Sequence, residues 1–274
     1  MRKFLVKFFI VITILIFLPI IYLSTFGVET ESFNDQIKDK VNERNKNLQI
    51  NLKKIKLKLD LLRLKVNAKT VGATIYYYNK PLELEYIGTK VSLVSIIKNK
   101  FVSSNFEIGS KSLPLGELIT FARAVHKGPE LFILEKIIKK GHVIFDLKIN
   151  YDENGKIKDD YEINGIIKDS KIQILDNNIY EKINFIFNLK KQEFKFQEIK
   201  FATNKINFFS DKINIKQKND IFYIDGIVKN KDATLSKNFL KISNLNLKNF
   251  DFDNTIFTST NNFSFEINKN FKLN

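Results

Sequence analysis

The sequence predicts a mostly β protein with a few short helices, in which an N-terminal transmembrane helix precedes a series of antiparallel strands. Three observations support this fold class. An apolar run fills Phe4 to Leu23, apolar and polar residues alternate from Leu48 onward and again in nearly all of the chain beyond Gly141, and helical spacing is confined to a few short segments.

The apolar run carries one charge, Lys7, and one proline, Pro19. A helix of about twenty residues reaches roughly 30 Å, the thickness of a bilayer's hydrocarbon core. Arg2, Lys3 and Lys7 lie at its amino-terminal side, while acidic residues follow it. The positive-inside rule therefore predicts a cytoplasmic N-terminus, with the rest of the chain across the membrane.

A cleaved signal peptide is the alternative for this segment, because its uncharged part, Phe8 to Leu23, is only slightly longer than a typical signal core. A cleavage site needs small residues, and Ser24 and Thr25 are flanked by Leu23 and Phe26. We therefore favour a retained anchor. Both alternatives export the chain, and the absence of cysteine agrees with that location.

The formal charge of +15 suggests an anionic partner. The lysines, however, alternate with apolar residues in segments such as Asn51 to Asp60, which is typical of a strand with one solvated face. We therefore expect no nucleic-acid binding. Attraction to anionic lipid head groups stays open.

Three domains are expected: a membrane anchor in residues 1–27, a mixed region in 28–140 and a repeating β region in 141–274. In the mixed region, a phase slip at Lys53 and Lys54 marks either a bulge or the join of two strands. The helices expected there are Thr30–Lys46, Val91–Phe101, Leu113–Val125 and Glu130–Lys140, and the strands after the slip are Val71–Tyr78 and Leu82–Ile87.

The region after Gly141 contains a weak internal repeat. Residues 161–169 resemble residues 222–230 at an offset of 61, with Gly165 matching Gly226. A glycine inside a strand often marks a close approach of backbone or side chain. The strands expected here are Val143–Tyr151, Ile157–Ile167, Ile172–Leu175, Ile183–Leu189, Phe194–Phe201, Ile206–Ile215 and Ile221–Val228, in an array that could continue beyond Asn274.

Each of these strands has one apolar face that must be covered by a second sheet, by helices or by something other than protein. The helices expected beyond the anchor and Thr30–Lys46 are confined to about residues 92–140, while apolar faces continue to the end of the chain. Two architectures stay open. One is a closed sandwich or barrel, and the other is an open, curved sheet whose trough holds acyl chains.

Several segments in this order resemble the amino-terminal part of AsmA-like, TamB-like and YhdP-like envelope proteins. They are the anchor, the short helix after it, the strand sequence Leu48–Leu59, the segment Val91–Lys98 and the strand sequence Tyr161–Gly165. The resemblance covers most of the chain. It implies a periplasmic protein tethered in the bacterial inner membrane, with an elongated, curved antiparallel sheet of repeating β units. The resemblance further implies that this sheet forms an apolar groove, which would conduct phospholipid toward the outer membrane and so contribute to outer-membrane homeostasis.

Parity within the strands selects the groove candidates, because successive side chains in a strand point to opposite faces. The lipid-groove candidates are Val143, Phe145, Leu147, Ile149, Ile163, Ile167, Phe185, Phe187, Phe194, Phe196, Ile213, Ile215 and Ile224.

Catalytic signals are weak. His126 and His142 are the only histidines, cysteine is absent, and the nucleophile-elbow and zinc-protease motifs do not occur. We therefore expect a protein that is not an enzyme, with no cofactor and no metal. The expected partners are phospholipid, the inner membrane, and outer-membrane or periplasmic proteins that extend the groove. The alternative function is an envelope scaffold that assembles outer-membrane proteins through β-strand pairing.

Overall fold

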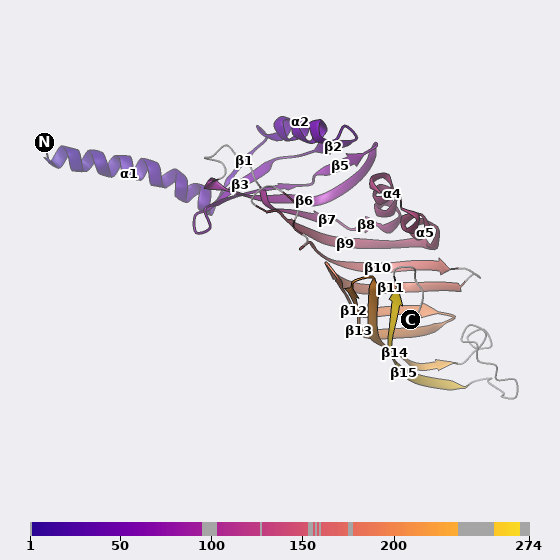
Figure 1. Ribbon diagram of the computed structural model, residues 1–274. Helices are drawn as coiled ribbons and strands as arrows, with labels where there is room; N and C mark the ends of the chain where they lie inside the picture. The colour runs from indigo at the N-terminus through magenta and orange to yellow at the C-terminus, as the bar shows by residue number, and fades with distance from the viewer. Residues whose placement is uncertain are drawn as a thin grey trace. The chain divides into compact units, whose positions relative to one another are not determined.

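The computed structural model describes residues 2–94, 103–126, 128–152, 156, 158, 160–174, 178–234 and 255–268. The protein is mostly β, with four helices among the described residues and one large, open antiparallel sheet of 15 strands (Figure 1). This confirms the predicted fold class. The chain divides into two compact units, residues 1–111 with 147–161, and residues 112–146 with 162–274.

Helix α1 (Arg2–Thr25) is the predicted apolar helix. Its segment Lys7–Thr25 has a mean hydropathy of 2.5 and contains no fully buried residue, which is consistent with a single anchor or a signal sequence. The helix ends sharply, because the amides of Phe26 and Gly27 both donate to the carbonyl oxygen of Tyr22, at 2.9 and 3.2 Å. Gly27 has a φ of +74°, and a Cβ placed there would lie 2.5 Å from the carbonyl oxygen of Leu57.

The first unit continues directly from this helix end. It contains β1 (Val28–Thr30), α2 (Asn34–Arg44), β2 (Leu48–Asn51), β3 (Ile55–Asp60), β4 (Lys65–Val71), β5 (Thr74–Tyr77), β6 (Lys80–Ser92) and β7 (Ser103–Ser110). The main ladder runs in the order β1-β3-β4-β6-β7, and β5 pairs with β2 and with the start of β6. The slip at Lys53 and Lys54 is therefore a join of two strands in different ladders.

Two predictions in this unit were wrong in part. The expected strand Val71–Tyr78 is interrupted at Gly72, which has a φ of +71° and separates β4 from β5. Val91 and Ser92 belong to β6 instead of a helix, because they pair with Val66 and Lys65 across the ladder. Residues 95–101 of that expected helix lie outside the described residues.

The core of this unit gathers around β6, which takes part in both ladders. Leu82, Leu84 and Ile87 of β6 are buried, together with Ile55 of β3 and Ala73. Helix α2 contacts β2. The first unit therefore has a small hydrophobic core of its own.

The second unit begins with a short helical segment and continues as a meander. Its elements are β8 (Leu113–Pro114), α4 (Leu115–Val125), α5 (Pro129–Ile137), β9 (Ile138–Asn150), β10 (Glu162–Ile174), β11 (Asn178–Lys190), β12 (Glu193–Thr203), β13 (Ile206–Lys218), β14 (Ile221–Thr234) and β15 (Ile256–Asn268). From β9 to β15 each strand neighbours the next. The expected helix Glu130–Lys140 ends early, because β9 already begins at Ile138.

Bulges interrupt the long strands of this unit. Asp169 in β10, Lys182 in β11, Glu198 in β12 and Asp232 in β14 have positive φ, and register shifts accompany them. Over the described residues, the two strands expected at Ile157–Ile167 and Ile172–Leu175 are one strand, β10, which begins at Glu162 and has a bulge between the two expected segments. Residues 157, 159 and 175 of these expected strands lie outside the described residues. A bulge bends its strand and increases the local twist.

Candidate functional site

The register of the meander aligns apolar residues into rows on one face of the sheet. Residues opposite each other on antiparallel strands point to the same face. The first row across β10 to β15 is Ile163, Leu189, Phe194, Ile215, Ile224 and Phe265. The second row is Gly165, Phe187, Phe196, Ile213, Gly226 and Phe263. We call these twelve residues the apolar face.

The rows that alternate with them point to the other face and are polar, with Tyr223 as the one aromatic member. One is Glu162, Lys190, Glu193, Lys216, Tyr223 and Glu266. The other is Asn164, Asn188, Lys195, Asn214, Asp225 and Ser264. Over these four rows the sheet therefore has one apolar face and one polar face.

Opposite charges stabilise the polar face. Lys190 Nζ lies 3.4 Å from Glu162 Oε1, and Lys195 Nζ lies 3.1 Å from Glu193 Oε2. A hydrogen bond from Asn188 lowers the pKa of Glu162 more than burial raises it, and smaller contributions from Asn164 and Lys190 lower it further. Lys195 lowers the pKa of Glu193 in the same way. Exposed pairs of this kind add little stability each, but they keep this face solvated.

The two matched glycines of the repeat occupy equivalent places in the second row. Gly165 is opposite Phe187 and Gly226 is opposite Phe263. A Cβ on Gly165 would fall on the ring of Phe187 and within 2.5 Å of the carbonyl oxygen of Ile144. A Cβ on Gly226 would lie 2.7 Å from Phe263 Cζ. In both places a phenylalanine ring covers a glycine, an arrangement that offsets the weakness of glycine in a sheet.

Aromatic side chains continue this face on both sides of the bulges. The ring centroids of Phe185 and Phe196 are 5.7 Å apart in an edge arrangement. Beyond the bulge, Phe201 and Phe208 stack with centroids 5.1 Å apart, and Tyr180 lies 6.3 Å from Phe201. Such pairs contribute more than their buried area alone.

The apolar face belongs to an open sheet, in which the substantial contacts of β11 to β15 are with their neighbouring strands (Figure 1). Helices α4 and α5 contact each other, and among the strands they contact β8 and β10. Phe187 is buried and most other members are half-buried, which neighbours on the same face can produce. Phe265 remains 37% exposed.

The structure brings most of the sequence candidates together. Seven are members of the two rows, and Ile167 is opposite Phe185 on the same face. Val143 and Phe145 lie on β9 with exposed neighbours His142, Ile144 and Asp146. Leu147 and Ile149 alternate in the same way but belong to the first compact unit, so they are not grouped with the apolar face.

The groove candidates selected from the sequence omit five members of the face, which are Gly165, Leu189, Gly226, Phe263 and Phe265. The signal for the last two was present, because Phe263, Ser264 and Phe265 alternate. Their strand could not be assigned to a neighbour without the register, which pairs Phe265 with Ile224 and Phe263 with Gly226.

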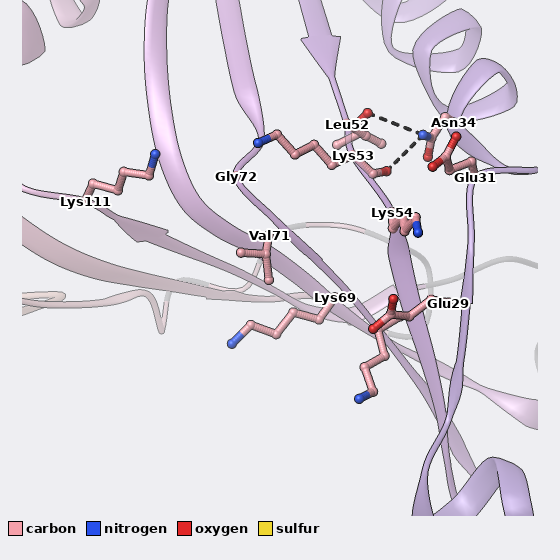
Figure 2. Close-up of a pocket in the computed structure, with 11 residues that line it drawn as sticks. Glu29, Glu31, Asn34, Leu52, Lys53, Lys54, Lys69, Val71, Gly72 and Lys111 are labelled. Atoms are coloured by element: carbon pink, nitrogen blue, oxygen red, sulfur yellow. Dashed lines mark hydrogen bonds between the residues drawn. The ribbon is translucent and has the colours of Figure 1, made fainter.

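A second feature is a basic cavity of about 730 Å³ in the first unit (Figure 2). Its cationic lining residues are Lys53, Lys54, Lys56, Lys69 and Lys111. Glu29 and Glu31 also line it, and Asn34 Nδ2 donates to the carbonyl oxygen of Lys53 at 2.9 Å. The cavity is open and its charges are solvated.

The histidines do not form a catalytic arrangement with the groups around them. His126 Nε2 lies 3.0 Å from Glu130 Oε1 at an exposed position, and His142 pairs with Pro114. Over the part of the chain that the structure describes, no group of three or more histidine or acidic side chains could hold a metal ion.

No protein-family model, no curated protein and no solved structure matches this chain. The resemblance to AsmA-like, TamB-like and YhdP-like proteins therefore stays a prediction.

Proposed function

We propose that this protein is anchored in the bacterial inner membrane and binds or conducts phospholipid along the apolar face of β10 to β15. The observation that carries the proposal is the pair of apolar rows, which run without a polar side chain across six strands of an open sheet.

The dimensions suit acyl chains. Strands lie about 4.8 Å apart, so a row across six strands is roughly 24 Å long. One leaflet of a bilayer's hydrocarbon core is about 15 Å thick, half of the whole core. An extended acyl chain can therefore lie along a row with its whole length against apolar side chains.

The chemistry of the face favours a ligand class over a single ligand. Its members carry no hydrogen-bonding side-chain atom, so attraction comes from removing apolar surface from water. Hydrophobic attraction is not directional, so it does not distinguish one phospholipid head group from another. The face therefore fits phospholipids of differing head group, held by their acyl chains.

Anchoring by α1 is part of the proposal, with Arg2, Lys3 and Lys7 on the cytoplasmic side and residues 28–274 in the periplasm. We expect the mature protein to keep its N-terminus, because no small-residue cleavage site follows the apolar run. N-terminal sequencing of the purified protein, and protease added to spheroplasts, measure this. A mature terminus near Gly27, or protection of the whole chain, would contradict it.

Photo-crosslinking in living cells tests the lipid site directly. A photoreactive residue at Phe187 or Ile215 is expected to capture phospholipid, detected by mass spectrometry of the purified protein. Lys195 and Lys216 are the matched controls, because they lie on β12 and β13 and point to the polar face. Equal capture at all four positions, or capture at none, would reject the lipid face.

A scaffold that pairs strands with outer-membrane proteins is the second candidate, and β15 supports it. This strand is the last in the sheet order, and Ile256–Asn268 contains neither lysine nor proline, the residues that usually blunt a sheet edge. Crosslinks from the β15 backbone edge to another β protein, without lipid capture at Phe187 or Ile215, would favour the scaffold.

A further inference from the structure

The turn between β3 and β4 exposes three leucines at its tip. Leu62 is 99% exposed, Leu64 53% and Leu61 44%. We infer that this tip, residues 61–64, inserts into the outer face of the bilayer that α1 spans, as a second membrane contact. The inference rests on the anchoring proposed above and not on the lipid-conducting face.

The pairing of β1 with β3 places the tip on the side of α1. Val28, the first residue of β1, is opposite Leu57, so Lys58 to Asp60 continue past the beginning of β1 in the direction from which the helix arrives. Gly27 lies against the carbonyl oxygen of Leu57. Figure 1 shows β3 beside the end of α1, and the two elements are in contact.

The burial pattern of α1 agrees with this placement. Ile20, Leu23 and Ser24 are half-buried and Gly27 is buried, whereas residues 7–19 are exposed. These positions are spaced by three and four and so share one side of the helix. The last two turns of α1 therefore have protein beside them, and β3 is the strand in contact with the helix.

Simple lengths place the tip at the level of the apolar span. Ile20 lies about 10 Å before Gly27 at 1.5 Å per helical residue. Three strand residues beyond Leu57 also reach about 10 Å. Because the apolar span runs to Thr25, a turn at the level of Ile20 to Thr25 meets the boundary between acyl chains and head groups.

The chemistry of the tip fits that boundary. Arg63 lies between Leu62 and Leu64, and Lys65 follows Leu64. The long side chains of these two basic residues can reach phosphate groups while their stems stay in apolar surroundings. Asp60 accepts a hydrogen bond from the Arg63 amide at 3.0 Å and is opposite Lys65. The turn is also fixed from the other side, because the Leu93 amide donates to the carbonyl oxygen of Leu64 at 2.9 Å.

Fluorescence from single labels tests the inference, because the chain has no cysteine of its own. The full-length protein carrying Leu62→Cys is labelled with an environment-sensitive dye and placed in nanodiscs of phosphatidylethanolamine and phosphatidylglycerol. Ile14→Cys, within α1, is the positive control. Asn79→Cys, exposed at the opposite end of β6, is the negative control.

We expect the labels at 14 and 62 to be blue-shifted and quenched by brominated lipids, and the label at 79 to show neither change. Adding Leu61→Ser and Leu64→Ser should shift the emission spectrum of the label at 62 toward the spectrum of the label at 79. A quenched label at 14 with an unquenched label at 62 would overturn the insertion of the tip alone. Loss of quenching at 14 would overturn the anchoring and the inference with it.

Discussion

Replacing Gly165 by alanine is expected to lower the free energy of unfolding by roughly 1 to 3 kcal/mol, the usual cost of overpacking. The added Cβ would fall on the Phe187 ring and 2.5 Å from the carbonyl oxygen of Ile144, which is backbone and cannot rotate away. Urea denaturation of the full-length protein in detergent, followed by far-ultraviolet circular dichroism, measures the change.

Two other glycines provide graded controls for the same substitution. Gly226→Ala should cost less than Gly165→Ala, because its Cβ would meet only the side chains of Phe263 and Ile213, at 2.7 and 2.9 Å. Gly88→Ala should leave stability nearly unchanged, since the nearest atoms would be 3.8 Å away. If all three variants and the parent had the same free energy of unfolding, the phenylalanine rings over Gly165 and Gly226 would have no structural role.

Ile224→Asp is expected to reduce the phospholipid that copurifies with the protein by at least about tenfold. A carboxylate in the path of an acyl chain costs a few kcal/mol when it loses water, and 1.4 kcal/mol is a factor of ten in binding. Ile227→Asp is the matched control, because Ile227 lies on the same strand but is opposite Asn262 on the polar face. That variant should retain its lipid.

The stability of the Ile224 variant separates an open face from a closed core. On an open face the new carboxylate stays in contact with water, so the variant should fold and lose only its lipid. In a packed sandwich the buried, unpaired charge would cost several kcal/mol and unfold the second unit. Lipid retained by a folded Ile224→Asp variant would reject the acyl-chain face, and unfolding would favour the sandwich.

The sequence predicted the faces of single strands well and their register poorly. Parity placed Phe187, Phe196 and Ile213 on inward positions of their own strands, because alternation is a local property. Register depends on the bulges at Asp169, Lys182, Glu198 and Asp232. Aspartate is enriched at positive φ, but lysine and glutamate are not, so residue type alone does not mark Lys182 and Glu198.

A usable signal for these bulges does exist. Each bulged strand contains a run of two or four consecutive polar residues, and the bulge lies within that run. The runs are Lys168 to Lys171, Glu181 with Lys182, Gln197 with Glu198, and Lys229 to Asp232. Interpreting the first run as a bulge would have joined Ile167 and Ile172 into one strand.

The end of β6 shows where local pattern fails for a different reason. Val91 and Ser92 are helical by spacing, but Val66 and Lys65 offer them ladder partners. Tertiary pairing overrides a weak local preference. The choice between an open sheet and a closed sandwich was likewise beyond sequence reasoning, which left both as alternatives.

The junction at Gly27 has a mechanical consequence. Phe26 and Gly27 are the only residues between α1 and β1, and their amides are both tied to Tyr22. Such a short, hydrogen-bonded connection passes a change in the orientation of α1 on to β1, whereas a flexible linker would not. Membrane-spanning helices tilt to match bilayer thickness. Under the anchoring proposed above, a change in the tilt of α1 therefore rotates the first unit, and the orientation of that unit depends on the thickness of the membrane.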